Sequence, residues 1–140
     1  MPDGNLTHLS PVLSIVVPTF KEALNVKLHY ASLSTALAGV DWEVVYVDDD
    51  SPDGTSDVLR DMSQQHPNLR LIHRIGRKGL ASAVIEGILS TAAPYVAVMD
   101  CDLQHDEKLL PLMLKELQSK QYDVVVGSRF VDGGSTGDWD

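Results

Sequence analysis

The sequence has almost none of the cysteine that stabilises many small secreted domains, because its 140 residues include a single one, Cys101. One cysteine excludes an intrachain disulfide framework and agrees with a reducing compartment. A chain of this length buries roughly two-thirds of its unfolded surface, so it needs neither disulfides nor a structural metal to fold. With 44% hydrophobic and 22% charged residues, it is predicted to be globular rather than disordered.

Long apolar runs are also missing. No stretch approaches the ~20 residues of a membrane-spanning helix, and the first residues lack the basic and apolar parts of a secretory signal. We therefore expect a cytoplasmic location. Residues 131–140 are glycine-rich and acidic, with no closing helix or strand, which predicts a fragment. The expected organisation is a tail at 1–12, one domain at 13–130 and the start of a truncated loop at 131–140.

Basic charge is scarce, since 11 lysines and arginines face 20 acidic residues and the net charge is −9. This balance argues against a nucleic-acid-binding protein, which needs a basic face for phosphates. The sequence also lacks G-x-S-x-G, G-x-G-x-x-G and G-x-x-x-x-G-K-[ST] motifs, so serine-hydrolase, dinucleotide-binding and P-loop functions lose their main support. The five histidines show no spacing typical of a metal site.

What the chain does contain is a regular alternation of apolar strands and helical patterns. Strands are predicted at 13–17, 42–47, 69–73, 95–99 and 123–127. Helical spacing of apolar residues is seen in three of the intervening segments, at Leu24, Leu28, Ala31 and Ala38, at Leu80, Ala83, Val84, Gly87 and Ile88, and at Leu109, Leu110, Met113, Leu114 and Leu117. Strands that are apolar throughout must be covered on both faces, which predicts a three-layer α/β fold with an open, mostly parallel sheet between helices.

Acidic residues gather where the predicted strands end. In open α/β sheets, ligands bind at the carboxyl ends of the strands. Residues 48–50 are three consecutive aspartates after the second strand, and Asp100 and Asp102 follow the fourth. Such carboxylates repel one another, and a bound cation with oxygen ligands usually reduces this repulsion.

The segment 100–104 is the sharpest candidate for a metal site. In an extended chain, Asp100, Asp102 and Gln104 share one face, while Cys101 points toward the apolar interior. Two carboxylates and an amide oxygen suit Mg²⁺ or Mn²⁺ and leave positions open for a diphosphate. The alternative is an ordinary turn, since turns are rich in aspartate. Cys101 is interpreted as a core residue rather than a nucleophile, and nearby His105 as a loop residue rather than a ligand.

The aspartates at 48–50 also have a structural interpretation, because Asp-Ser-Pro-Asp-Gly is a common turn. Asp53 and Thr55 are expected to be structural, as helix-capping residues. Asp48 and Asp49 end a buried strand and need hydrogen-bond donors, which the base or ribose of a nucleotide could supply.

Three basic residues follow the third predicted strand, at Arg74, Arg77 and Lys78. They precede Gly79 and a helix start, where a phosphate could bind. They either meet a diphosphate or lie in solvent, and the sequence leaves both possibilities open.

Five ordered motifs resemble the family 2 glycosyltransferases of the GT-A fold: residues 16–22 (VVPTFKE), 47–55 (VDDDSPDGT), 79–83 (GLASA), 100–105 (DCDLQH) and 127–130 (GSRF). The resemblance covers about residues 13–134. Within the family, the second and fourth motifs are most similar to dolichol-phosphate or polyprenol-phosphate mannosyltransferases. The fold implied is a Rossmann-like nucleotide-sugar-binding domain.

The resemblance implies a site for GDP-mannose. Its nucleotide would lie against residues in and after the first two strands: Pro18, Phe20, Glu22, Val47 and Asp49. Asp100, Cys101 and Asp102 would lie near the ribose and diphosphate, and the metal, Mg²⁺ or Mn²⁺, would be held mainly by Asp102 and Gln104. Arg129 would contact the phosphates, so Asp102 and Arg129 are the implied catalytic residues.

The implied reaction is an inverting transfer of mannose to a polyprenyl phosphate. That acceptor is already an anion, so no general base is needed. The whole protein would work at the cytoplasmic face of a membrane, with 131–140 opening an acceptor-side loop. The fragment alone is expected to bind the donor at best, without turnover. Family members carry acceptor-binding elements beyond these residues.

The sequence departs from the family pattern at Cys101, where alanine is usual, at Lys21, where asparagine is common, and at Ala81-Ser82, where Gly-Thr is common. Two alternatives to the mannosyltransferase therefore stay open: another family 2 enzyme that uses a UDP-sugar, and a non-catalytic nucleotide-sugar-binding module. A receiver domain is disfavoured because its acidic pair follows the first strand. A nucleotidyltransferase lacks support because no glycine- and basic-rich loop follows the first strand.

Overall fold

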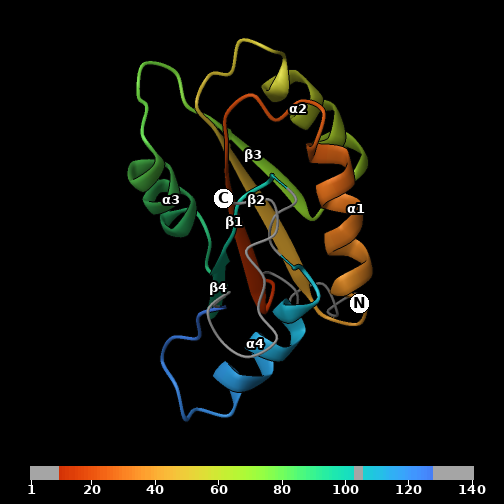
Figure 1. The fold of residues 1–140 in the computed structure, drawn as a ribbon, viewed down its shortest axis with the longest axis vertical. Helices are drawn as coiled ribbons and strands as arrows, with labels where there is room; N and C mark the ends of the chain where they lie inside the picture. Colours follow the sequence, from red (N-terminus) through yellow and green to blue (C-terminus); the bar gives the residue numbers. More distant parts are fainter. Residues whose placement is uncertain (1–9, 103–105, 128–140) are drawn as a thin grey trace, which may run out of the picture.

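The computed structural model describes residues 10–102 and 106–127. Within them, strands and helices alternate along the chain (Figure 1): β1 (Leu13–Thr19), α1 (Val26–Ala36), β2 (Trp42–Asp48), α2 (Thr55–Gln65), β3 (Leu69–His73), α3 (Leu80–Leu89), β4 (Tyr95–Val98) and α4 (Leu109–Gln118). A search of this part of the chain finds no helix with the length and apolar character needed to cross a membrane.

The described strands form one parallel sheet in the order β3-β2-β1-β4. The first three strands end level with one another, because Thr19 pairs with Asp48 and Asp48 pairs with His73. After β3 the chain crosses to the other side of β1, where β4 pairs Val98 with Val16. The strand order therefore reverses beside β1, the position where open α/β sheets bind ligands.

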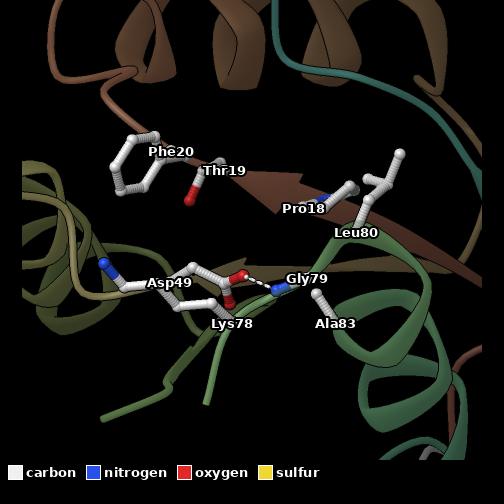
Figure 2. Close-up of a pocket in the computed structure, with 8 residues that line it drawn as sticks. All are labelled: Pro18, Thr19, Phe20, Asp49, Lys78, Gly79, Leu80 and Ala83. Atoms are coloured by element: carbon white, nitrogen blue, oxygen red, sulfur yellow. Dashed lines mark hydrogen bonds between the residues drawn. The ribbon is translucent and has the colours of Figure 1, made fainter. Parts of the chain in front are cut away.

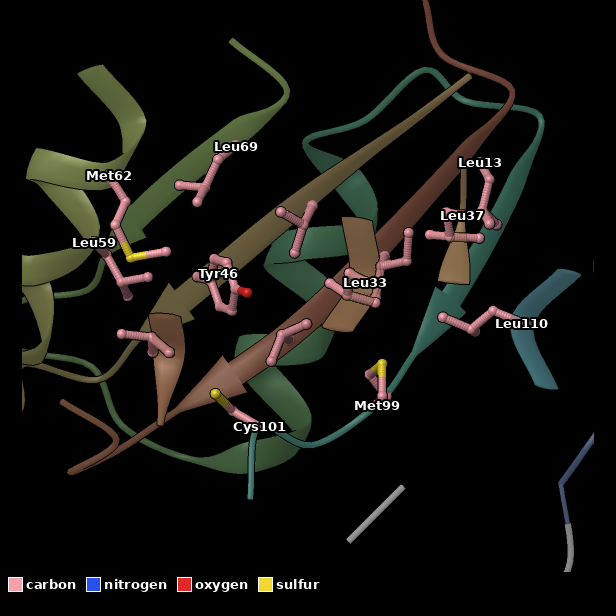
Figure 3. Packing of buried hydrophobic residues seen from close by; sticks show 14 of the residues in the cluster. Leu13, Leu33, Leu37, Tyr46, Leu59, Met62, Leu69, Met99, Cys101 and Leu110 are labelled. Carbon is pink, nitrogen blue, oxygen red and sulfur yellow. The ribbon is translucent and has the colours of Figure 1, made fainter. Parts of the chain in front are cut away.

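Two apolar clusters fill the two faces of the sheet. The larger one lies under α1, α2 and α4 (Figure 3) and includes fifteen buried residues. The smaller one lies under α3 and consists of Val16, Val45, Val47 and Ala83. Gly87 lets α3 approach closely, since a Cβ there would lie 2.4 Å from Val16 Cγ1. The predicted α/β architecture with covered sheet faces is confirmed.

The first helix forms as predicted but buries a different face. All four apolar residues that predicted it are exposed: Leu24, Leu28, Ala31 and Ala38. The buried residues are Val26, His29 and Leu33. The His29 ring Nδ1 lies 2.8 Å from the Tyr46 hydroxyl, and this hydrogen bond allows a polar ring to enter the core. Hydropathy patterns treat histidine as a surface residue, which is why the prediction chose the wrong face.

The predicted fifth strand, 123–127, is wrong. These residues form no strand in the structure, and Val124 and Val126 are 74% and 77% exposed. Valine favours a strand only where a neighbouring strand offers backbone partners and the two faces are covered. In the described part of the chain, the sheet ends at β4 on this side, so the run of valines lacks both.

Candidate functional site

A cavity of about 300 Å³ opens at the carboxyl ends of β1 and β2, against the start of α3. We call it the α3 pocket. Figure 2 shows the residues that line it: Pro18, Thr19, Phe20, Asp49, Lys78, Gly79, Leu80 and Ala83. Asp49 and Lys78 bring the charged groups, and most of the remaining wall is apolar. A mostly apolar cavity with few polar groups is typical of a site for a small organic ligand.

Phe20 presents an aromatic face at the pocket, with 46% of the residue exposed. The chain turns sharply after it, because Lys21 has a φ of 59° and its backbone N–H donates to Ser51 Oγ over 2.9 Å. The ammonium groups of Lys21 and Lys78 lie 5.3 and 5.7 Å from the ring centroid. The ring is thus flanked by positive charge and can stack on a flat ligand.

The Asp49 carboxylate is held in place from two sides. Its Oδ1 lies 2.8 Å from Arg74 Nε, although the two groups are not aligned as a hydrogen bond. Its Oδ2 accepts the backbone N–H of Gly79 over 2.9 Å, as Figure 2 shows. Gly79 has a φ of 130°, which residues with a Cβ rarely adopt. Asp49 therefore joins the end of β2 to the start of α3.

A row of alternating charges continues behind Asp49. Arg74 is fully buried, and its Nη1 donates to Glu86 over 2.9 Å and to Ser82 over 3.0 Å. Glu86 also accepts hydrogen bonds from Arg77. These bonds are the main reason that the pKa of Glu86 lies below its ordinary value. Arg74 thus meets neither a diphosphate nor solvent, the two possibilities that the sequence left open.

Asp48 is satisfied by the protein itself. Its buried carboxylate accepts hydrogen bonds from the hydroxyls of Thr19, Ser51 and Ser56 over 2.7 to 2.8 Å, and from the Ser51 backbone N–H over 3.0 Å. The expectation that a nucleotide could supply these donors is therefore wrong for Asp48. Its role in the structure is to join the end of β1 to the loop that precedes α2.

Asp53 and Thr55 are structural, as expected, but the prediction that they cap the helix is wrong, because the N-cap residue of α2 is Gly54 and the cap makes no side-chain hydrogen bond. The Asp53 carboxylate accepts the backbone N–H groups of Thr55 and Ala23 over 3.1 and 3.3 Å. The Thr55 hydroxyl also donates to Asp53, and chiefly for this reason the pKa of Asp53 lies below its ordinary value. Thr55 Oγ1 accepts the Glu22 backbone N–H over 3.0 Å. These bonds fix the loop after β1, which carries Phe20, against the loop after β2.

At the end of β4, the side chains alternate as the sequence predicted. Cys101 is buried in the larger cluster, while Asp100 is exposed and Asp102 is partly exposed. Burial raises the pKa of the Cys101 thiol, and the negative charges of Glu22, Asp102 and Asp100 raise it further. The interpretation of Cys101 as a core residue is confirmed. The effect of Glu22 also places the loop after β1 near this acidic segment.

The two aspartates fit a hard divalent cation by their chemistry, since both are oxygen donors outside the apolar core. Among the residues that the structure describes, no group of three histidine, cysteine, aspartate or glutamate side chains could hold a metal ion. The third predicted ligand, Gln104, lies outside the described residues, as do His105 and Arg129. The complete predicted metal set therefore stays a prediction.

The structure brings three of the predicted nucleotide-binding residues together, since Pro18, Phe20 and Asp49 all line the α3 pocket. The Val47 side chain is fully buried in the smaller cluster and does not line it. Glu22 also lies outside this lining, and its carboxylate accepts a hydrogen bond from Asn25 Nδ2 over 2.7 Å.

Sequence reasoning missed Arg74 as the partner of Asp49. The sequence offered only one signal, which is that Arg74 directly follows the strand predicted at 69–73. It also treated Lys78 only as a possible phosphate contact, although this residue lines the pocket.

Comparisons with known proteins identify the family of the chain. The chain is 36% identical over 127 residues to a dolichol-phosphate mannosyltransferase from Pyrococcus furiosus, with 91% of this chain and 36% of that protein covered. It is 34% identical over 143 residues to a dolichol-phosphate mannosyltransferase from Mycosarcoma maydis, with 97% and 48% covered. The chain thus spans less than half the length of these relatives.

A solved structure is also similar: a mannosyltransferase from Pyrobaculum calidifontis in complex with GDP-Man and Mn²⁺. The TM-score is 0.59 at 27% identity, and the match covers 68% of this chain and 28% of that one. The model of the family described as glycosyl transferase family 2 matches residues 14–140. The chain therefore belongs to glycosyl transferase family 2, and its parallel sheet and helices form a GT-A-like fold.

Proposed function

We propose that this chain is the donor-binding part of a polyprenol-phosphate mannosyltransferase that takes mannose from GDP-mannose. The observation that carries the proposal is the α3 pocket, where a fixed carboxylate, Asp49, and an aromatic face, Phe20, meet in an otherwise mostly apolar cavity. The likeness to dolichol-phosphate mannosyltransferases over about nine-tenths of the chain supports the choice of sugar and acceptor.

In this proposal, the base of the donor enters the α3 pocket. Its flat face stacks on Phe20, and its N–H groups donate to Asp49. Arg74 and Gly79 already hold the carboxylate, so little side-chain freedom is lost when the base binds. Pro18 closes the apolar side of the cavity.

The diphosphate then extends toward the acidic segment after β4. Asp100, Asp102 and Gln104 would hold Mg²⁺ or Mn²⁺ there, and Cys101 keeps the segment anchored in the core. When bound, the cation supplies charge neutralisation for the departing diphosphate. Arg129 is proposed to contact the phosphates of the donor or the acceptor.

The acceptor of the whole protein would be a polyprenyl phosphate at the cytoplasmic face of a membrane. Its phosphate oxygen attacks the anomeric carbon from the side opposite the diphosphate, which inverts the configuration of the sugar. This nucleophile is an anion at neutral pH, so a protein base has no proton to remove. Asp102 and Arg129 are the catalytic residues of this proposal.

Calorimetric titration of the chain with GDP-mannose, with and without Mn²⁺, tests the proposal. We expect cation-dependent binding that Asp49→Ala and Asp102→Ala each weaken at least tenfold. Asp61→Ala is the matched control, because Asp61 is an exposed carboxylate on α2, outside both sites. Tighter binding of UDP-glucose would indicate a family 2 enzyme with a different donor. No binding of any nucleotide sugar to folded protein would contradict the proposal.

A further inference from the structure

The outer surface of α3 is apolar, whereas that of α2 is polar. The exposed residues of α2 include Asp57, Arg60 and Asp61, and none of its exposed residues is apolar. On α3, four exposed residues at helical spacing form what we call the α3 face: Ala81, Ile85 (56% exposed), Ile88 (39%) and Leu89 (79%). A surface helix normally carries polar residues on this side. A contiguous apolar patch there indicates a surface that meets a partner.

The other sides of α3 already make the contacts that hold the helix in place. Gly87 lies against the sheet, where a Cβ would be 2.4 Å from Val16 Cγ1. Glu86 is the only charged residue in 79–99, and its carboxylate accepts hydrogen bonds from two arginines that precede the helix. The α3 face therefore carries no charged residue and has little part in holding the helix on the sheet.

The loop that leads into α3 adds positive charge at one end of the α3 face. Figure 1 shows this loop projecting beyond the first turn of the helix. Ile75 is 65% exposed there, and the basic residues Arg77 and Lys78 are exposed as well. The loop thus combines an accessible apolar side chain with two cations, next to a helix surface that is entirely apolar.

We infer that the α3 face and the loop before it dock on the surface of an anionic lipid bilayer. Ile85 and Leu89 enter the boundary between headgroups and acyl chains, while Arg77 and Lys78 stay among the headgroups. The apolar contact holds the helix at the interface, and each cation adds attraction to anionic lipid. The proposed function brings the whole protein to a membrane but assigns no surface to the contact, so this inference goes beyond it.

The size and position of the α3 face favour a bilayer over a second copy of the chain. A stable protein interface buries roughly 800 Å² on each partner, more than four side chains on a ten-residue helix offer. Lys78 and Leu80, beside this face, also line the α3 pocket. A second copy would extend over the pocket, whereas a bilayer beside it can present the lipid acceptor. In this last respect the inference rests on the proposed function.

The net charge of −9 does not oppose this contact. At physiological ionic strength, charges more than about 8 Å from the bilayer are largely screened, so the local charge of the docking surface decides. On that surface, Arg77 and Lys78 are accompanied by one carboxylate, Glu86. Arg74 and Arg77 both pair with Glu86 over 2.9 Å, which offsets its negative charge.

Co-sedimentation of the chain with lipid vesicles tests the inference, without nucleotide or metal. We expect binding to vesicles of equal parts phosphatidylglycerol and phosphatidylcholine, at least fivefold stronger than to phosphatidylcholine alone. The double variant Arg77→Gln with Lys78→Gln should lose this preference for anionic vesicles. Thermal melting confirms that each variant folds.

The decisive variant is Ile85→Ser with Leu89→Ser, which removes the two apolar side chains from the α3 face. Binding to the anionic vesicles should weaken at least tenfold, because the apolar area that enters the interface is lost. The matched control is Leu24→Ser with Leu28→Ser. These leucines are 92% and 59% exposed, and they lie at the start of α1, on the opposite side of the sheet. The control should bind as tightly as wild type.

Three outcomes would overturn the inference. The first is no binding of the folded wild-type chain to either kind of vesicle. The second is an equal loss in the control variant, which would show that the contact is not specific to α3. The third is a dimer in sedimentation velocity that Ile85→Ser with Leu89→Ser dissociates, which would assign the α3 face to a second copy. None of these measurements involves GDP-mannose, so each leaves the proposed function to be judged by the calorimetric titration.

Discussion

The carboxyl ends of β2 and β4 both carry aspartates, yet their surroundings differ. After β2, the protein supplies the partners: three hydroxyls and a backbone N–H for Asp48, and Arg74 for Asp49. After β4, acidic residues crowd together, and the negative charges of Glu22, Asp102 and Asp100 act jointly on the Cys101 thiol.

This difference separates two uses of the same residue type. Carboxylates with built-in partners shape a site and stabilise the fold. Carboxylates that raise the negative potential of one segment favour a bound cation instead. The end of β2 is therefore the preformed part of the site, and the end of β4 is the part that we expect to respond to metal.

The largest effect should come from Asp48. Asp48→Ala leaves the hydroxyls of Thr19 and Ser56 buried without their acceptor, so the free energy of unfolding should fall by about 3 kcal/mol. Urea denaturation measures this change. Asp61→Ala on the exposed side of α2 is the control and should change the value by less than about 0.5 kcal/mol. An unchanged free energy of unfolding for Asp48→Ala would contradict the interpretation that the carboxylate at the end of β2 stabilises the fold.

Gly87→Ala should have the next largest effect, because it moves the helix that closes the pocket. The added methyl would meet the buried side chains of Val16 and Val47, and overpacking of this kind costs about 2 kcal/mol. The control is Gly127→Ala, where a Cβ would be 3.9 Å from its nearest neighbour, on Leu109. Thermal melting should separate the two variants clearly. Equal melting temperatures would mean that α3 does not pack closely on the sheet.

The other end of β2 provides a test of pH dependence. Burial alone would raise the pKa of Glu43, but hydrogen bonds from Arg70 and Thr91 outweigh it and hold the pKa below its ordinary value of 4.5. The stabilisation is therefore present above pH 4.5 and lost as the pH falls through the lowered pKa.

Glu43→Gln should cost about 1 kcal/mol of unfolding free energy at pH 7. The difference from wild type should shrink below pH 4.5, where the wild-type carboxylate takes up a proton. Urea denaturation at several pH values measures this trend. A difference that grows as the pH falls would show that the sign is wrong.

The smallest effect on stability is expected at the end of β4. Asp102→Asn should change the free energy of unfolding by less than about 0.5 kcal/mol in the absence of metal, since the residue is partly exposed and lies among like charges. Melting curves with and without Mn²⁺ plus GDP should then differ for wild type but not for the variant. A strong loss of stability without ligands would place Asp102 with Asp48, as a structural residue.

Much of the fold could be predicted from the sequence, because the residues of β1 and β2 are apolar or β-branched in unbroken runs. The pocket residues Phe20 and Asp49 could also be predicted, since they follow such runs. His29 and Arg74 could not be predicted as core residues. Their burial depends on the Tyr46 hydroxyl and on two carboxylates, and these partners are distant in sequence.

At the valines 124–126 the error is the opposite one, because the sequence predicted a strand that the structure does not contain there. The composition of this segment favours a strand, but strand formation depends on neighbours that composition does not reveal. The lesson for the site is similar, because a single aspartate after a strand is ambiguous by itself. Asp48 and Asp49 are adjacent in the sequence. Only their partners in the structure distinguish Asp48, a structural residue, from Asp49, a residue of the pocket.

The row of Asp49, Arg74, Glu86 and Arg77 has a further consequence for how ligands reach the protein. Two acids alternate with two bases, so the row carries no net charge. The potential of alternating charges fades over a shorter distance than that of a single charge. The row itself should therefore contribute little to the salt dependence of nucleotide binding, and salt should act mainly on the two lysines beside Phe20 and on the acidic segment after β4.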